Sequence, residues 1–213
     1  MICGAIDIGT NTLLLLIAEV EDNKIIRVIA DEHQIARLGE GLGKTGIISD
    51  SAIIRATRIL YDYKNILKNN KAEKITVSAT SAMRDASNSE AVKSLFESII
   101  GHNIEIISGV DEARISYLGS VEEYSSTADI VLDIGGGSTE IVKGIHDDIS
   151  YSSSLQIGAV RITEKFFPTQ KSKGTNISFA REFIISSFKE FQNINMGGKL
   201  IAVAGTPTTI AAI

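Results

Sequence analysis

A short glycine-containing motif occurs twice in this chain at a fixed distance. The first copy, DIGTNT, begins at Asp7, and the second, DIGGGSTE, begins at Asp133, 126 positions later. Two more pairs of segments resemble each other at an offset of 125: EVEDNKI with GIHDDIS, and KITVSAT with KLIAVAGT. An amphipathic helix is expected before the last segment of each half. Similar elements in one order at one offset predict a duplicated unit.

Each copy is expected to contain three strands joined by short turns, then a helix and a further strand. Short turns make the three strands antiparallel, and the strand that follows the helix should join them in parallel. The pattern predicts two α/β domains, each a mixed sheet flanked by helices, over residues 1–125 and 126–213. The expected strands are Ile2–Ile8, Thr12–Val20 and Ile25–Ala30 in the first copy, and Asp129–Ile134, Thr139–Gly144 and Ile149–Leu155 in the second.

The helix of each copy is predicted from apolar residues at helical spacing. Ser49 or Asp50 is expected to cap the first helix, and Ser178 the second. The apolar face of the first helix consists of Ile53, Ala56, Leu60, Tyr63 and Leu67, and that of the second lies along Ala180, Phe183, Ile184, Ser187, Phe188 and Phe191.

The first copy continues further than the second. Helices are predicted at about residues 88–100 and 110–122, with a strand at 104–107 between them. The second copy has no such continuation and stops after the AGTPTT turn, so we expect the second domain to be incomplete. The apolar face of the helix at 88–100 consists of Val92, Leu95, Phe96, Ile99 and Ile100.

Composition narrows the class of protein. The longest apolar run, Leu13 to Ala18, is too short to span a bilayer, and the N-terminus lacks the pattern of a signal peptide. Cys3 is the only cysteine, which excludes an internal disulfide and a cysteine zinc site. The net charge of −5 argues against broad nucleic-acid binding. We therefore expect a cytoplasmic protein with no membrane or nucleic-acid partner, and a homodimer is compatible with the sequence.

The two glycine turns point to phosphate chemistry. Glycine allows a tight turn, and successive backbone N–H groups in such a turn can form a nest for phosphate oxygens. The aspartate before each turn, Asp7 or Asp133, suits a hydrated Mg²⁺ ion. Two such turns facing each other across a cleft would hold a chain of phosphates; ordinary hairpin turns are the simpler alternative. Hydroxyl donors would come from Thr10, Thr12, Ser138 and Thr139.

The motifs resemble those of known phosphate-binding proteins. DIGTNT, DIGGGSTE and the late AGT are similar to the loops of the actin, Hsp70 and sugar-kinase superfamily, which implies two ribonuclease-H-like domains. ATSAMRDASN, ISGVDEARISYLG and SLQIGAVRITEKFF resemble segments of the Ppx/GppA family of exopolyphosphatases and guanosine pentaphosphate phosphatases. The resemblance covers almost the whole chain.

The resemblance implies a role for particular residues. Glu112 would be the general base, Asp133 and Glu140 would hold magnesium and the attacking water, Asp7 would be their counterpart, and Arg84 would contact the phosphate chain. Asp111 and Ala204 depart from the common pattern, which has glutamate and serine there. The phosphate loops would comprise Thr10, Asn11 and Thr12, then Gly135, Gly136, Gly137, Ser138 and Thr139, with Gly205 and Thr206 in a third loop.

The expected function is release of terminal orthophosphate from inorganic polyphosphate or guanosine pentaphosphate with Mg²⁺ or a similar divalent cation, which would connect the chain to the stringent response. From the residues alone, a helix-end charge is the better interpretation of Glu112, and Arg84 is equally well a solvated partner of Asp85; the family resemblance reverses the interpretation of Glu112. A small-molecule kinase and a sensor without turnover are the alternatives. Glu112, Asp133 and Glu140 together favour the hydrolase.

Overall fold

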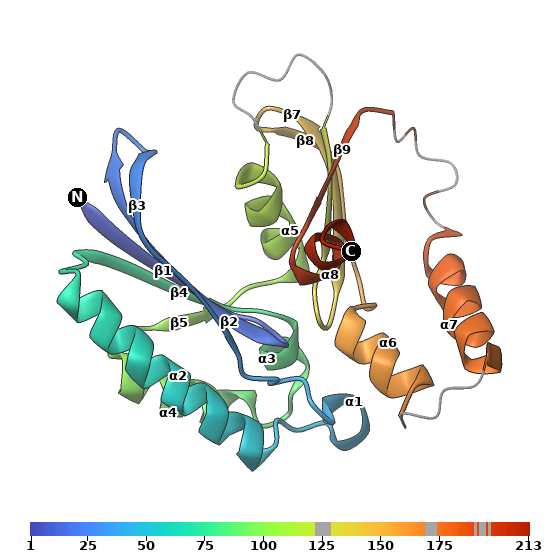
Figure 1. Cartoon of the computed structure of the whole chain (residues 1–213), viewed down its shortest axis with the longest axis horizontal. Coiled ribbons are helices and arrows are strands. Elements are labelled where there is room, and N and C mark those ends of the chain that lie inside the picture. Colours follow the sequence, from blue (N-terminus) through green and yellow to red (C-terminus); the bar gives the residue numbers. More distant parts are fainter. Residues whose placement is uncertain (122–128, 169–173, 190, 192–194, 196) are drawn as a thin grey trace. The chain divides into compact units, whose positions relative to one another are not determined.

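The computed structural model describes residues 1–121, 129–168, 174–189, 191, 195 and 197–213. The chain divides into two compact units, Met1–Ile107 and Ser108–Ile213. Figure 1 shows the elements of both, and each unit is described by itself. No helix among the described residues combines the length and the apolar character needed to cross a membrane.

The first unit is a five-stranded mixed sheet with helices on it. The strand order is β3-β2-β1-β4-β5; β1, β2 and β3 are antiparallel, and β4 and β5 join in parallel. Helices α2 and α4 lie side by side on one face of this sheet (Figure 1). In order, the elements are β1 (Ile2–Ile8), β2 (Thr12–Glu21), β3 (Lys24–Ile35), α1 (Leu42–Thr45), α2 (Asp50–Asn69), β4 (Lys74–Ala79), α3 (Ser81–Asp85), α4 (Ser89–Ile100) and β5 (Ile104–Ile106).

The core of the first unit lies between helix α2 and the sheet face formed by alternate residues of β1 and β2. Ser49 caps α2 by accepting a hydrogen bond from the Ala52 N–H, as expected. Tyr63 of α2 donates its hydroxyl to the Leu13 carbonyl at 2.7 Å, and burial raises its pKa to about 12. The sheet face toward α2 consists of the buried Ile6, Ile8, Leu13, Leu15 and Ile17.

The second unit is a four-stranded mixed sheet in the order β8-β7-β6-β9. Helix α5 packs on this sheet through Ala113 and Tyr117, which contact Val131 of β6 and Val142 of β7. The elements are α5 (Gly109–Leu118), β6 (Asp129–Ile134), β7 (Thr139–Ile145), β8 (Asp148–Leu155), α6 (Ala159–Phe166), α7 (Gly174–Ser187), β9 (Lys199–Val203) and α8 (Gly205–Ala211).

The structural boundary differs from the sequence prediction. We predicted domains over 1–125 and 126–213, whereas the compact units separate between Ile107 and Ser108. Helix α5 is the reason, because its buried side chains pack on the sheet that follows it in the sequence. The helix also ends at Leu118, and the remainder of the predicted range to residue 122 lies partly outside the described residues.

The duplicated unit is confirmed down to the register of its strands. Asp7 is opposite Leu14 in the first hairpin, and Asp133 is opposite Glu140 in the second. The parallel strand joins at the same place in both copies, with Cys3 beside Lys74 and Asp129 beside Lys199. The irregularity between Ile17 and Ala18 in the first copy also recurs between Lys143 and Gly144 in the second.

Several local expectations were wrong. Helix α7 begins at Gly174, so Ser178 lies inside the helix and does not cap it. Leu95, expected on the apolar face of α4, is exposed. Strand β3 runs to Ile35, beyond the predicted end at Ala30, because it stays paired with the whole length of β2. The AGTPTT segment is the start of helix α8 and not an open turn.

Candidate active site

The second glycine turn, Gly135–Thr139, is held from one side by helix α6. The Gly135 carbonyl accepts from the Ala159 N–H at 3.0 Å, and the Gly136 carbonyl accepts from the N–H groups of Val160 and Arg161. The side chain of Arg161 donates from Nε to the Gly137 carbonyl at 2.9 Å. Three successive carbonyls therefore face α6, while the N–H groups of Gly136 and Gly137 donate to no acceptor among the described residues.

Close backbone packing, rather than unusual backbone angles, explains two glycines in these segments, Gly9 and Gly158. Glycine also permits positive φ, but Gly9 and Gly135–Gly137 all lie outside that region. A Cβ on Gly158 would instead lie 2.5 Å from the backbone carbon and oxygen of Gly136. A Cβ on Gly9 would lie 2.7 Å from the Thr12 carbonyl oxygen. Glycine is needed in these segments because backbone passes against backbone.

The first glycine turn has the same design. The Gly9 N–H donates to the Thr12 carbonyl at 3.1 Å, as the Gly135 N–H does to Ser138 in the second turn. The Asn11 carbonyl accepts from the N–H groups of Ala36 and Arg37, which follow β3. The carbonyls of this turn are thus also bound by the segment after the third strand.

Two predicted acidic residues lie together at the turn end of the second sheet. Asp133 of β6 and Glu140 of β7 are opposite each other in the antiparallel pair. They share the sheet face of Val131 and Val142, which pack against α5. Apolar partners thus give way to carboxylates where the strands reach the turn.

Burial disfavours the charged form of both carboxylates. It raises the pKa of Asp133, and the hydrogen bond from Ser116 offsets part of that effect. The pKa of Glu140 rises to about 7, first through burial and then through the negative charge of Glu112; Asp133 adds a smaller effect in the same direction. The negative charge of Glu112, in the first turn of α5, thus acts on the pKa of Glu140 in the same direction as burial.

Two serines that sequence reasoning missed hold these carboxylates. Ser116 of α5 donates to Asp133 Oδ2 at 2.6 Å, and Ser154 of β8 donates to Glu140 Oε1 at 2.7 Å. Ser116 follows Glu112 by four residues, so the two share one helix face. That spacing was the available signal for Ser116. Ser154 sits in a run of three serines, and no sequence pattern distinguishes it from its neighbours.

Glu112 lies in the first turn of α5, whose cap is made by its neighbours. Ser108 accepts from the Asp111 N–H at 3.1 Å and donates its hydroxyl to Asp111 Oδ2 at 2.6 Å. Asp111 therefore takes part in the N-terminal cap of the helix. Glu112, half-buried on the same turn, is the residue whose charge acts on Glu140.

The hydroxyl groups of the two turns differ in their surroundings. Thr139 is buried and donates its hydroxyl to the Ile157 carbonyl at 2.7 Å, and the hydroxyl of Ser138 is hydrogen-bonded to Glu140. In the first turn Asn11 donates to the Thr12 hydroxyl oxygen at 3.4 Å, and Thr10 is buried. The hydroxyls of Ser138 and Thr139 thus hold the second turn in place.

Asp7 and Arg84 belong to the first unit. Asp7 is in β1, beside Ser78 of β4. Arg84 lies in helix α3, not in a loop, and donates to the Ile107 carbonyl at 2.9 Å. The expectation that the two glycine turns face each other across a cleft, with Asp7 opposite Asp133, stays a prediction, because each unit is described by itself.

The third predicted loop, Gly205–Thr206, forms the start of α8 at the end of β9. The residue before it, Ala204, has φ 72° and ψ −177°, a region that is essentially reserved for glycine. A side chain here costs roughly 1–3 kcal/mol of backbone strain. Ala204 is also one of the two positions, with Asp111, at which the sequence departs from the pattern of the family that it resembles.

Ala204→Gly is expected to stabilise the chain by about 1 kcal/mol, because relief of the strain exceeds the entropy cost of glycine. Urea unfolding measures the change. Ala202→Gly is the matched control: it lies in the regular strand β9 and should destabilise by roughly 0.5–1 kcal/mol. Equal destabilisation by both substitutions would contradict a strained backbone at Ala204.

The donor set in the second unit suits a hard divalent cation. No group of three or more histidine, cysteine or acidic side chains within metal-binding geometry occurs in the described part of the chain. Mg²⁺, however, commonly uses one or two carboxylates and keeps several waters. Asp133 and Glu140 provide oxygen ligands, and a bound cation would favour their charged forms, which burial otherwise disfavours.

Two copies of one α/β unit, each with a glycine hairpin between its first two strands, give the chain an actin-like fold. The ethanolamine utilization protein EutJ of Carboxydothermus hydrogenoformans shares this fold with a TM-score of 0.56 at 15% identity, over 96% of this chain and 76% of that one. Within this class, the chain belongs to the Ppx/GppA phosphatase family, whose model matches residues 16–213.

Relatives within the family are much more similar. Exopolyphosphatase 2 of Mycobacterium tuberculosis is 35% identical over 224 residues, covering 99% of this chain and 70% of that protein. A guanosine-5′-triphosphate,3′-diphosphate pyrophosphatase of Pseudoalteromonas translucida is 34% identical over 178 residues, 83% of this chain and 36% of that protein. The crystal structure of an exopolyphosphatase-like protein superposes with a TM-score of 0.92 at 31% identity, over 99% of this chain and 68% of that chain.

Proposed function

We propose that this chain hydrolyses the terminal phosphoanhydride bond of inorganic polyphosphate or guanosine pentaphosphate. The observation that carries the proposal is the position of the second glycine turn. Its carbonyls are bound on the side of α6, and its hairpin places Asp133 and Glu140 opposite each other beside Glu112. A glycine turn that would bind phosphate oxygens and the two paired carboxylates thus lie at one end of one sheet. The similarity to an exopolyphosphatase and to a guanosine-5′-triphosphate,3′-diphosphate pyrophosphatase supports this substrate class.

Phosphate binding, proton transfer and metal binding would be carried out by different residues of the second unit. The N–H groups of Gly136 and Gly137 would bind the oxygens of the terminal phosphate, whose charge grows in the transition state. Glu112 would accept the proton of the attacking water. Asp133 and Glu140 would hold Mg²⁺, which when bound neutralises charge on the phosphate oxygens. Ser116 and Ser154 fix the directions of these two carboxylates.

Orthophosphate release tests the proposal directly. The purified chain is incubated with Mg²⁺ and either polyphosphate, guanosine pentaphosphate, or ATP with a sugar or acetate acceptor. Release from one of the first two substrates supports the hydrolase, and the faster of them identifies the preference. Phosphate transfer to an acceptor would indicate a kinase, and tight binding without release would indicate a sensor; either result would replace the proposal.

Asp133→Asn is expected to reduce activity and to raise the Mg²⁺ concentration at half-saturation, because the amide loses the charge that attracts the cation. The fold should persist, since the amide can still accept the hydrogen bond from Ser116. A magnesium titration of orthophosphate release measures the effect. Asp148→Asn, at an exposed position of β8, is the control. Unchanged magnesium dependence in Asp133→Asn would show that Asp133 is not a ligand.

A further inference from the structure

Arg161 lies in the SLQIGAVRITEKFF segment, where no role is predicted for it from the sequence, yet its side chain binds the second glycine turn. It lies in the first turn of α6, is half-buried, and donates from Nε to the Gly137 carbonyl at 2.9 Å. Its other end is also fixed, because a terminal nitrogen donates to Gln156 Oε1 at 3.0 Å. The guanidinium therefore spans from the end of β8 to the middle of the turn.

The first turn of α6 binds the two preceding carbonyls. The N–H groups of Ala159, Val160 and Arg161 donate to Gly135 and Gly136. Helix N-termini normally leave such N–H groups unsatisfied, and an anion can bind there directly. In this chain they are used by the glycine turn, so the end of α6 does not itself provide the anion site.

The geometry of the peptide groups determines the direction in which the N–H groups of the second glycine turn point. In a trans peptide the C=O and N–H groups point in opposite directions, and the described chain contains no cis peptide. The carbonyl of Gly135 shares a peptide unit with the N–H of Gly136, and the same relation links Gly136 to Gly137 and Gly137 to Ser138. Holding the three carbonyls against α6 consequently directs three successive N–H groups away from it.

Electrostatics works in the same direction. The positive end of the α6 dipole meets the negative ends of the glycine peptide groups, whose positive ends are the outward N–H groups. Arg161 adds a full positive charge behind the same peptide groups. Gly158 permits the close approach, because a Cβ there would lie 2.5 Å from Gly136.

We propose that Arg161 is a positioning residue that, through the Gly137 carbonyl, aims the N–H groups of the second glycine turn at the phosphates of an anionic chain. This inference rests on the proposed function, since it assigns the same turn to phosphate binding. Arg161 itself acts from behind the turn and does not touch the substrate. Its effect should therefore be found in the affinity for phosphate chains rather than in the chemical step.

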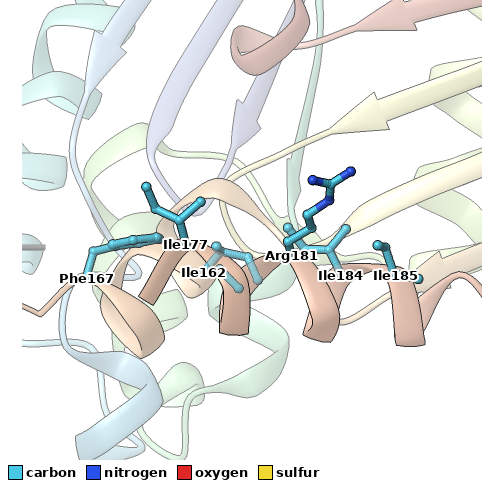
Figure 2. A pocket seen from close by; sticks show the side chains of 7 residues that line it. Ile162, Phe167, Ile177, Arg181, Ile184 and Ile185 are labelled. Carbon is cyan, nitrogen blue, oxygen red and sulfur yellow. The ribbon is translucent and has the colours of Figure 1, made fainter. Parts of the chain in front are cut away.

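The test compares Arg161→Met, Arg161→Lys and a matched control, Arg181→Met. Arg181 has the same charge as Arg161 and lies in the same unit, but it is on α7. There it lines an apolar hollow together with Ile162, Phe167, Ile177, Ile184 and Ile185 (Figure 2). Binding of inorganic tripolyphosphate is measured by calorimetry. KM and kcat are measured for the preferred substrate, and thermal unfolding is recorded for each variant.

Arg161→Met is expected to raise both the tripolyphosphate Kd and KM about tenfold, the lower range for a lost hydrogen bond to a charged group, with kcat within about twofold. Arg161→Lys should recover most of the affinity, because an ammonium group can still donate to the Gly137 carbonyl. Arg181→Met should match the unmodified chain. The changes in amide chemical shift of Gly136 and Gly137 on addition of tripolyphosphate should be smaller in Arg161→Met than in the unmodified chain.

Three outcomes separate this inference from the function on which it rests. If the unmodified chain binds tripolyphosphate but releases no orthophosphate, the proposed function is overturned and the role of Arg161 is still decided by the binding data. If Arg161→Met only lowers thermal stability while Kd and KM stay unchanged, the inference is overturned and the function stands. If the unmodified chain does not bind tripolyphosphate, both are overturned.

Discussion

Replacing Glu112 with glutamine is expected to lower kcat by about 10²–10⁴-fold, the usual contribution of a positioned general base. The amide keeps the size of the side chain but cannot take the proton of the attacking water. KM should change little, because the glycine turns provide the phosphate contacts. Steady-state kinetics of orthophosphate release, with kcat and KM determined separately, measure the effect.

The neighbouring carboxylate offers a matched control. Asp111→Asn changes the adjacent residue in the same helical turn, but the Asp111 side chain is bound to Ser108 in the cap of α5. Asp111→Asn should keep kcat within a few-fold of that of the unmodified chain and should reduce the stability of the fold slightly. A full kcat in Glu112→Gln, or equal losses in both variants, would show that Glu112 acts only as a helix-end charge.

Glu140 is expected to make the stability of the metal-free chain fall as the pH rises. Its pKa is about 7 in the folded chain, against an ordinary value of 4.5. The folded state therefore holds the proton more tightly than the unfolded state. The resulting stabilisation is fully present below about pH 4.5 and is lost as the pH rises through about 7, with a total near 3 kcal/mol.

Glu140→Gln removes this pH dependence, because the neutral amide has no proton to lose. At pH 8 in the presence of a chelator the variant should be more stable than the unmodified chain by up to about 3 kcal/mol, and at pH 4.5 the two should be similar. Urea unfolding at both pH values measures this, with the exposed Glu90→Gln as the control. Equal stability of the two chains at pH 8 would contradict a buried, disfavoured charge at Glu140.

The regular part of the fold could be predicted from the sequence because its signals are periodic and repeated. Strands Ile2–Ile8, Asp129–Ile134 and Thr139–Ile145 begin at the expected residues, since apolar alternation marks the strands and glycine marks their turns. Short turns predicted which strands pair, and the repeat at one offset predicted the same pairing in both copies. The registers of the two hairpins agree with this duplication.

Other features could not be predicted because one residue type serves several purposes. Glycine suits both positive φ and close backbone contact, and only the position of Gly158 against Gly136 shows that the second applies. Serine is common both at helix caps and inside helices, so Ser178 was misplaced while Ser49 was correct. The apolar residues of α5 fit a sheet on either side of it in the sequence, which is why the domain boundary differs.

The matching registers of the two hairpins show how two copies with one backbone can differ in chemistry. The backbone position opposite the aspartate is occupied by Leu14 in the first copy and by Glu140 in the second. The same hairpin geometry thus occurs in both halves, while the side chain across from the aspartate is aliphatic in one and acidic in the other. A single position therefore gives the two hairpins different chemical capacity, because only the second pairs two carboxylates across its strands.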